Sequence, residues 1–169
     1  MQRSILLFPE FSNHEVIGEI RNRYDPLASS IGPHITLVFP FVCDLTTEAL
    51  AGHMQKAMIS AKPFLLRFEG FSGDDRDGFL FLNVKRGNDD VIALHDRLYT
   101  DVLAPFLYRK LPYFPHLTVG RLRESAAFDR ALEGLAGLHD SFETVIDRVW
   151  LETIGEDERS IREQFIELK

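Results

Sequence analysis

One tetrad of residues occurs twice in this chain, at equivalent places in its two halves. Residues 33–36 read Pro-His-Ile-Thr and residues 115–118 read Pro-His-Leu-Thr, and each tetrad opens a predicted strand. The six histidines would give on the order of 0.01 such tetrads by chance, so two of them are informative. The repeat favours a chain built from two similar units.

The helical segment before each tetrad repeats in the same way. Residues 15–17 read Glu-Val-Ile and precede Tyr24, while residues 90–92 read Asp-Val-Ile and precede Tyr99 at the same offset. A loop containing proline then leads to each tetrad. Because a helix and a strand repeat in the same order, we interpret the chain as internally duplicated.

Hydrophobic periodicity gives the order of the elements. The predicted strands are Ser4–Phe8, Pro33–Phe41, Phe64–Phe71, Phe79–Lys85, Phe114–Leu122, Val145–Ile154 and Ile161–Leu168. The predicted helices are Ser12–Tyr24, Thr47–Ala61, Asp90–Leu107 and Ala126–Leu138. The first helix is expected to open with a capping box, in which Ser12 is the N-cap and Glu15 lies three residues later.

These elements predict an α+β fold in a single unit over residues 1–169. A chain of 169 residues is about one domain. The pseudo-repeats divide it near residues 1–75 and 76–169 into two similar lobes. We expect antiparallel or mixed sheets that face a central cleft, with the helices outside.

The period of two in a strand assigns the residues of each motif to faces of a sheet. In the first strand, one face would carry His34, Thr36 and Val38, and the other Ile35, Leu37, Phe39 and Phe41. In the second strand, His116, Thr118 and Gly120 would share a face. Arg121 would lie on the opposite face unless the strand bends at Gly120. The apolar faces would pack under helices, which leaves two imidazoles and two hydroxyls in the cleft, and Phe39 and Phe41 away from it.

Paired histidines and threonines suit the chemistry of phosphodiesters. Because histidine titrates near neutrality, one imidazole can be a neutral base while the other is a protonated acid. The base would take a proton from water or a hydroxyl, and the acid would protonate the departing ribose oxygen. The threonine hydroxyls would donate hydrogen bonds to the nonbridging oxygens. We expect no metal or other cofactor, and the single cysteine excludes a zinc site built on several thiolates.

Two His-x-Thr motifs on strands, about half a small α+β chain apart, resemble those of the 2H phosphoesterase superfamily. Residues 20–26, followed by residues 33–41, are similar to its 2′-5′ RNA ligase-like branch. The resemblance implies a bilobal fold, with His34 and His116 as the catalytic pair and Thr36 and Thr118 as phosphate-binding hydroxyls. It also implies metal-independent hydrolysis of cyclic or 2′,5′-linked nucleotide phosphodiesters, with ATP-independent ligation as the reverse reaction. The sequence agrees, because it contains no Gly-rich phosphate loop and no Lys-x-Asp-Gly motif.

Four further residues are candidates for binding the substrate. They are Tyr24, Arg76, Tyr113 and Arg121. Core packing is the favoured interpretation of Tyr24, and a plain hairpin turn is favoured for the loop that holds Arg76. Tyr113 flanks the second tetrad and is a candidate for stacking. Arg121 belongs to one of two windows without acidic residues, 26–43 and 105–123, which favours an anionic ligand near the tetrads.

The formal net charge of −7 limits the choice of partners. A protein that grips long nucleic acid usually has a large basic face, so we expect a small nucleotide or an RNA end and no extended nucleic-acid binding. No apolar run approaches the ~20 residues of a membrane span, and residues 1–9 lack the apolar core of a signal peptide. With one cysteine there is no disulfide framework, so we expect a cytoplasmic protein. We also expect it to be a monomer.

The expected function is therefore hydrolysis of a 2′,3′-cyclic phosphate, or a related cyclic phosphodiester, on a nucleotide or at an RNA end. The alternative is a catalytically silent module that binds a nucleotide or an RNA end and keeps the cleft. The presence of both histidines and both threonines favours the enzyme. The sequence leaves open which histidine is the base and whether the product is a 2′- or a 3′-phosphate.

Overall fold

The computed structural model describes residues 1–110 and 112–169 of the chain. Its strands are β1 (Gln2–Leu7), β2 (Ile35–Val42), β3 (Phe64–Asp74), β4 (Phe79–Arg86), β5 (His116–Arg121), β6 (Ser141–Ile146), β7 (Arg148–Ile154) and β8 (Ser160–Glu167). Its helices are α1 (His14–Tyr24), α2 (Thr47–Ala57), α3 (Asn88–Leu98), the 3-10 helix η1 (Asp101–Phe106) and α4 (Ser125–Ala136). The predicted α+β class is confirmed.

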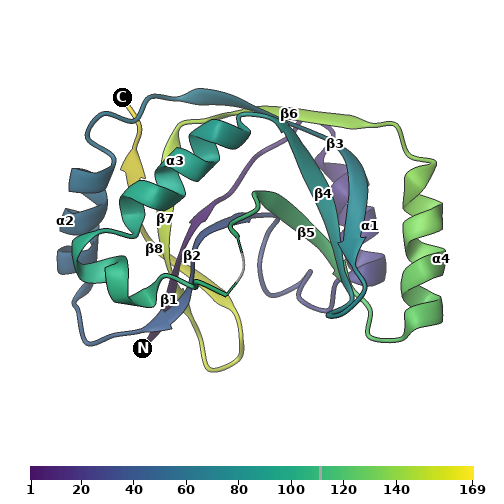
Figure 1. Cartoon of the computed structure of the whole chain (residues 1–169), viewed down its shortest axis with the longest axis horizontal. Coiled ribbons are helices and arrows are strands. Elements are labelled where there is room, and N and C mark those ends of the chain that lie inside the picture. The colour runs from purple at the N-terminus through teal and green to yellow at the C-terminus, as the bar shows by residue number, and fades with distance from the viewer. Residues whose placement is uncertain (111) are drawn as a thin grey trace.

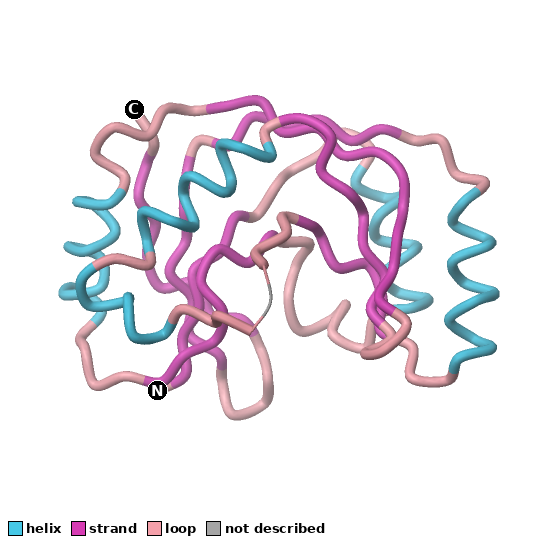
Figure 2. Tube along the Cα trace, viewed as in Figure 1, coloured by secondary structure: helices cyan, strands magenta, loops and turns pink. Residues whose placement is uncertain are grey.

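The strands form two curled antiparallel sheets whose open faces lie toward one another (Figure 1). The first sheet has the order β2-β1-β7-β8 and the second has the order β5-β4-β3-β6. Helices α2 and α3 pack against the first sheet, and α1 and α4 pack against the second, on the outer sides of the molecule (Figure 2). Strands β2 and β5 contact each other at the centre. The expected arrangement of two facing sheets with helices outside is therefore confirmed.

Each sheet is assembled from both halves of the chain. Strands β1 and β2 pair with β7 and β8 from the end of the chain, while β3 pairs with β4 and β6. The helices before the two tetrads also cross over, since α1 packs against β5 and α3 packs against β2. Each motif strand is thus supported from behind by the helix that precedes the other motif.

A continuous hydrophobic core fills the space between the sheets and their helices. Ile5 and Leu7 of β1 are fully buried, and so are Leu80 and Leu82 of β4. These residues alternate along their strands, as expected for strands with one face on a core. The other face of each strand is left for the cleft.

The predicted helix at Asp90–Leu107 is wrong in its second half. α3 ends at Leu98, Thr100 is extended, and η1 begins at Asp101, whose φ is +44°. A single α-helix would place Pro105 in its interior, where proline removes a hydrogen bond and clashes with the preceding turn. Within η1 it is Leu103 that is buried, whereas Val102, which continues the helical spacing of Leu94 and Leu98, is 43% exposed.

The predicted strand Val145–Ile154 is also wrong, because it is two strands in different sheets. β6 pairs with β3 in the second sheet, and β7 pairs with β1 and β8 in the first. The buried positions change phase at Asp147, from Phe142 and Ile146 before it to Val149 and Leu151 after it. This change of phase marks the point where the chain passes from one lobe to the other.

The predicted capping box does not form. α1 begins at His14 with Asn13 as its N-cap residue, and no side chain caps the helix. The Asn13 side chain instead donates a hydrogen bond to the carbonyl of Ser141 at the start of β6, 3.2 Å away. None of the helices in the described residues is long and apolar enough to span a membrane.

Candidate functional site

The two motif histidines are held in the same way by the backbone. Nδ1 of His34 lies 2.9 Å from the carbonyl oxygen of Gly32, and Nδ1 of His116 lies 2.7 Å from that of Phe114. In each case the acceptor is two residues earlier in the chain. Because a carbonyl can only accept, Nδ1 carries the proton and Nε2 of each ring is left for chemistry.

Burial lowers the pKa of both imidazoles below the ordinary value for histidine. For His34, desolvation is the largest cause of the lowered pKa, and repulsion from Arg21 lowers the pKa further. The hydrogen bond to Gly32 and the charge of Asp25 raise it. The charge of His116 lowers the pKa of His34 further, so the two rings sense each other. Desolvation also lowers the pKa of His116, against the opposing bond to Phe114. Both rings therefore favour the neutral form in the free protein near pH 7.

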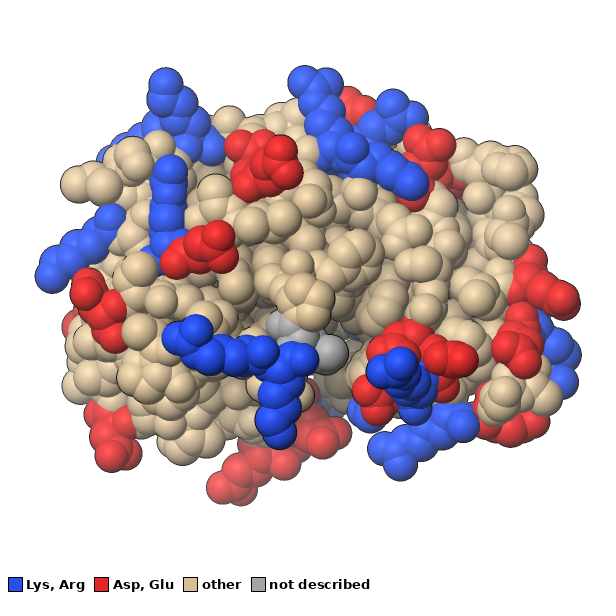
Figure 3. Space-filling model, viewed as in Figure 1, with Lys and Arg blue, Asp and Glu red and all other residues tan. Residues whose placement is uncertain are grey.

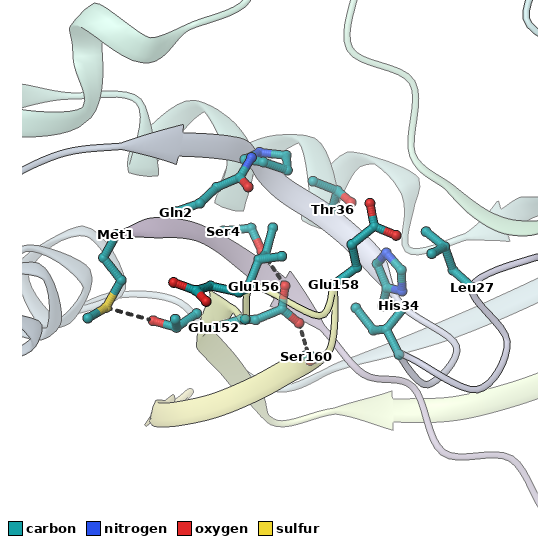
Figure 4. A pocket seen from close by; sticks show the side chains of 15 residues that line it. Met1, Gln2, Ser4, Leu27, His34, Thr36, Glu152, Glu156, Glu158 and Ser160 are labelled. Atoms are coloured by element: carbon teal, nitrogen blue, oxygen red, sulfur yellow. Dashed lines mark hydrogen bonds between the residues drawn. The ribbon is translucent and has the colours of Figure 1, made fainter.

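Two hollows open beside the histidines, and Thr36 lines both of them. The first, which we name the polar hollow, has a volume of about 1000 Å³ and is lined by His34 and by three glutamates of β7 and the turn after it (Figure 4). These are Glu152, Glu156 and Glu158. The buried carboxylate of Glu152 accepts hydrogen bonds from the hydroxyls of Ser4 and Ser160.

The second hollow, which we name the aromatic hollow, has a volume of about 630 Å³ and contains His116 and Thr118. Its aromatic lining is Phe39, Phe79, Phe81, Tyr108, Tyr113 and Phe114. The His116 ring lies beside two of these, 4.2 Å from the centroid of Phe81 and 5.5 Å from that of Phe114. Flat apolar walls with a few polar groups are typical of sites that bind small molecules with rings.

A β-bulge follows each His-x-Thr motif and changes which residues face the cleft. In β5, Thr118 pairs with Phe81 and Gly120 pairs with Leu80, which leaves Val119 without a partner. Arg121 then pairs with Phe79 and lies on the same face as His116. Its guanidinium carbon is 4.6 Å from the centroid of the Phe79 ring. The expectation that Arg121 lies opposite His116 is therefore wrong, and the bend that would reverse it is this bulge.

The equivalent bulge in β2 lies at Leu37. Thr36 pairs with Leu6 and Val38 pairs with Ile5, so Val38 is on the core side, contrary to the alternation. Phe39 is 41% exposed and lines the aromatic hollow, so the expectation that it faces away from the cleft is also wrong. A second irregularity before Phe41 restores the phase, and Phe41 is buried as expected.

Gly120 lies on the core face of β5 rather than on the face of His116. A Cβ at this position would be 2.7 Å from the Cβ of Tyr24 and 3.1 Å from the Leu80 side chain. Tyr24 therefore packs behind the motif strand and lines neither hollow, which agrees with the favoured core interpretation. Glycine allows α1 to approach β5 this closely.

Tyr113 and Tyr99, from the second half of the chain, hold the bulged part of β2. The Tyr113 hydroxyl donates to the carbonyl of Thr36, 2.9 Å away, and the Tyr99 hydroxyl accepts from the backbone N–H of Phe39, 3.0 Å away. The Tyr113 ring is stacked on His95 with its centroid 3.7 Å away, and it also borders the aromatic hollow. Burial raises the pKa of Tyr113, so its hydroxyl remains a donor.

Arg76 is exposed in the turn between β3 and β4 and lines neither hollow. Its neighbours Asp74 and Asp77 border the aromatic hollow instead. Sequence reasoning missed the buried ion pair of Arg21 and Asp25, 2.8 Å apart, whose charges both act on His34. Its signal was the i, i+4 spacing on the helix before the first tetrad.

On the face of the molecule seen in Figure 3, basic and acidic side chains are interspersed and neither forms a continuous surface.

With both motifs placed, the chain can be compared with known proteins. Residues 8–158 match the sequence profile of one family, described as the 2′-5′ RNA ligase superfamily. The chain belongs to this superfamily.

Relatives of this superfamily member include proteins that carry the provisional name phosphoesterase. A Bacillus pumilus protein provisionally named phosphoesterase is 30% identical over 123 residues, which cover 72% of this chain and 70% of that protein. A Bacillus licheniformis protein with the same provisional name is 27% identical over 154 residues, covering 89% of each chain. The resemblance drawn from the two tetrads is therefore confirmed.

Two crystal structures share the fold of this superfamily member. Escherichia coli LigT complexed with 3′-AMP gives a TM-score of 0.67 at 16% identity, covering 99% of this chain and 97% of LigT. The Thermus thermophilus protein TT0787 gives a TM-score of 0.67 at 14% identity, covering 99% of this chain and 98% of TT0787. At these identities the likeness establishes the LigT-like fold alone.

Proposed function

We propose that this protein is a metal-independent phosphodiesterase that opens 2′,3′-cyclic phosphates, or related cyclic phosphodiesters, on nucleotides or RNA ends. The observation that carries the proposal is that His34 and His116 have the same backbone support and lie in neighbouring hollows that share Thr36. LigT, which has the same fold, binds 3′-AMP and phosphate in crystals, and this supports a phosphate-bearing nucleotide as the ligand.

The contrast between the hollows assigns a role to each histidine. The aromatic hollow suits the base and ribose of a nucleoside, because its rings can stack on the base. The ribose oxygen that leaves phosphorus is then on the side of His116, and the attacking water is on the side of the polar hollow. In-line attack thus makes His34 the base and His116 the acid.

The reaction balances with these two proton transfers. A water oxygen forms a bond to phosphorus while its proton passes to the neutral Nε2 of His34. The bond from phosphorus to one ribose oxygen breaks, and that oxygen takes a proton from Nε2 of protonated His116. The product is a nucleoside monophosphate, and solvent restores the starting protonation states. With a ribose hydroxyl of a second RNA end in place of the attacking water, the same two proton transfers would join two ends without ATP, which is the reverse of the transesterification that cleaves a 2′,5′ linkage.

The acid must be protonated even though burial lowers the pKa of His116 in the free protein. An anionic phosphate between the rings favours their charged forms and would raise the pKa of both. Substrate binding therefore supplies the condition for acid catalysis. Thr36 and Thr118 would donate to the nonbridging oxygens. Arg121 lines neither hollow, but its bulge puts it on the same face as His116, from which it would neutralise part of the charge on those oxygens.

The test is a panel of 2′,3′-cyclic nucleotides, 3′,5′-cyclic nucleotides, RNAs with cyclic phosphate ends and ADP-ribose cyclic phosphate, assayed in EDTA. We expect turnover of at least one cyclic phosphate, and the loss of about 10²-fold or more in kcat for His34→Ala and for His116→Ala. The matched control is His139→Ala, which removes an exposed histidine far from the motifs in sequence.

Two outcomes would overturn the proposal. Turnover that disappears in EDTA and returns with added zinc, magnesium or manganese would mean that the histidines do not act alone. Binding of a nucleotide without turnover of any member of the panel would support a nucleotide-binding module in place of the enzyme.

A further inference from the structure

Aromatic rings and guanidinium groups alternate across the first sheet in what we name the Arg-aromatic strip. Its members are Phe8, Arg162, Trp150, Phe165 and Arg148. The guanidinium carbon of Arg162 lies 3.8 Å from the Phe8 centroid and 5.3 Å from that of Trp150. The rings of Trp150 and Phe165 have centroids 4.9 Å apart, and Arg148 lies 5.3 Å over Phe165.

The strip lies on the same open face of the sheet as the candidate site. Leu6 of β1 pairs with Thr36 on one side and with Trp150 on the other, and Trp150 pairs with Phe165. Residues directly opposite in an antiparallel pair share a face, so this row runs from Thr36 across to β8. At the near end, the Phe8 centroid is 6.1 Å from that of His34.

Arg162 joins the strip to the His34 motif. Its guanidinium lies 3.6 Å from where a Cβ of Gly32 would be, and the carbonyl of Gly32 accepts the hydrogen bond from Nδ1 of His34. Arg162 is exposed, and no carboxylate of the described residues is within ion-pair distance of it. Arg148, at the far end, is paired with Asp147. The available positive charge of the strip is therefore next to the site.

Carboxylates border the strip on both sides. Glu152 is the cross-strand partner of Arg162, and Glu10 and Asp147 line a hollow together with Arg162. Ser4 pairs with Glu152 at one end of this face, where the three glutamates line the polar hollow, and Leu6 pairs with Trp150 at the other. A chain of phosphates is repelled by the glutamates and attracted by Arg162. The Phe165 ring is 40% exposed, and such rings beside a cation are the combination that single-stranded nucleic acids use for stacking and phosphate contact.

We propose that the Arg-aromatic strip binds the single-stranded RNA that continues from the reacting nucleotide, over about two nucleotides. The reacting phosphate would lie between the histidines with its nucleoside in the aromatic hollow, and the strand would turn back at the reacting ribose. The next phosphate would then lie near Arg162, and the following bases on Trp150 and Phe165. This inference rests on the proposed function, because it takes an RNA end as the substrate. It limits contact to a short tail, in keeping with the acidic net charge of the protein.

The test compares two probes that need no turnover, a pentanucleotide ending in a 3′-phosphate and the corresponding nucleoside 3′-monophosphate. Fluorescence anisotropy of the labelled pentanucleotide, with the mononucleotide as competitor, gives both affinities. We expect the pentanucleotide to bind at least about 10-fold more tightly. Trp150→Ala and Arg162→Gln should each reduce the ratio of the two affinities about 10-fold. Trp150→Phe should keep most of that ratio, because a phenyl ring still stacks.

The matched control is Arg159→Gln, an exposed arginine of the β7–β8 turn that is paired with Asp157 and lies outside the strip. It should leave the advantage unchanged. The proposal is overturned if both probes bind equally well, if Arg159→Gln acts like Arg162→Gln, or if an acidic peptide competes as well as the pentanucleotide. Circular dichroism and the Tm of each variant, with Trp150→Phe as the conservative change, separate loss of binding from loss of folding.

The proposed function and the strip can fail separately. Preferential binding of the pentanucleotide without turnover of any cyclic phosphate would support the strip and reject the phosphodiesterase. Turnover of cyclic nucleotides without that preference would support the phosphodiesterase and reject the strip.

Discussion

In the first lobe His34 faces a hollow lined by glutamates and lies near the buried pair of Arg21 and Asp25, whereas in the second lobe His116 lies beside the rings of Phe81 and Phe114. Their backbones are nevertheless alike. Each ring donates from Nδ1 to the carbonyl two residues earlier, and each motif is followed by a bulge. The two halves therefore share the means of presenting a histidine and differ in what surrounds it.

The repeat therefore gives the two histidines the same backbone geometry, while the side chains around them make their surroundings unequal. Two identical imidazoles in identical surroundings could exchange roles. Here the aromatic surroundings of His116 favour the nucleoside side of a substrate, and the polar surroundings of His34 favour water. The predictions that follow test whether the halves are as unequal as their surroundings indicate.

The largest effect should come from the histidines and should depend on the leaving group. For a cyclic nucleotide, His34→Ala and His116→Ala should each lower kcat by about 10²-fold or more. For a p-nitrophenyl phosphodiester, whose leaving group needs no acid, His116→Ala should recover most of its activity and His34→Ala should not. Steady-state kinetics with both substrates measures this. Equal recovery in the two variants would mean that the roles are not divided as proposed.

The threonines should show a smaller inequality of the same kind. Thr36 lines both hollows and Thr118 lines one, so Thr36→Val should lower kcat/KM by about 10²-fold and Thr118→Val by about 10-fold. Valine keeps the shape of threonine and removes only the hydroxyl. Comparison of kcat/KM for the two variants on one cyclic nucleotide is sufficient. A larger loss for Thr118→Val would place the phosphate nearer to the second motif.

The close approach of α1 behind β5 gives an effect on stability. Gly120→Ala should lower the free energy of unfolding by about 1–3 kcal/mol, because its Cβ would meet the Cβ of Tyr24 at 2.7 Å. Gly52→Ala is the control, since a Cβ on that helix position has nothing within 4 Å. It should leave the protein as stable or more so, because alanine favours helix. Urea denaturation of both variants makes the comparison, and equal stabilities would show that α1 can retreat from β5 without cost.

The smallest effect is on the pH profile. The base must be neutral, so activity rises with pH through its pKa, and the acid must be charged, so activity falls through its pKa. Both pKa values are lowered, so the optimum of kcat/KM should lie on the acid side of about 6.5. The optimum of kcat should lie higher, because bound phosphate raises both. Asp25→Asn should move only the rising limb, and to lower pH, since Asp25 raises the pKa of His34. A shift of the falling limb instead would reverse the assignment of base and acid.

The same lowered pKa values link folding to pH. The unfolded chain binds protons at its histidines near pH 6.5, before the folded protein does, so the free energy of unfolding should fall as pH drops below that value. Chemical denaturation between pH 7 and pH 5 measures the slope. His34→Asn and His116→Asn should each make the slope shallower.

The sequence predicted the parts of this site that depend on composition and short spacing. Hydrophobic periodicity predicted the α+β class. The two tetrads predicted the two facing sheets and the family, because a duplicated motif of this kind is improbable by chance. The alternation of side chains along a strand failed for Phe39 and Arg121, which it placed away from the cleft. The sequence prediction also failed at residue 147, where one predicted strand passes from one sheet to the other.

These failures have one physical reason, which separates what the sequence determined from what the tertiary structure decided. Periodicity reports the side-chain pattern of one strand, so residues 33–36 and 115–118 could be recognised alone. A bulge exists only relative to a partner strand. Val119 has no partner because its neighbours Thr118 and Gly120 pair with the adjacent residues Phe81 and Leu80. The Arg-aromatic strip likewise joins residues from β1, β7 and β8 that only the register of the first sheet brings together. The sequence alone therefore determined the duplicated histidines, and strand pairing decided which side chains face them.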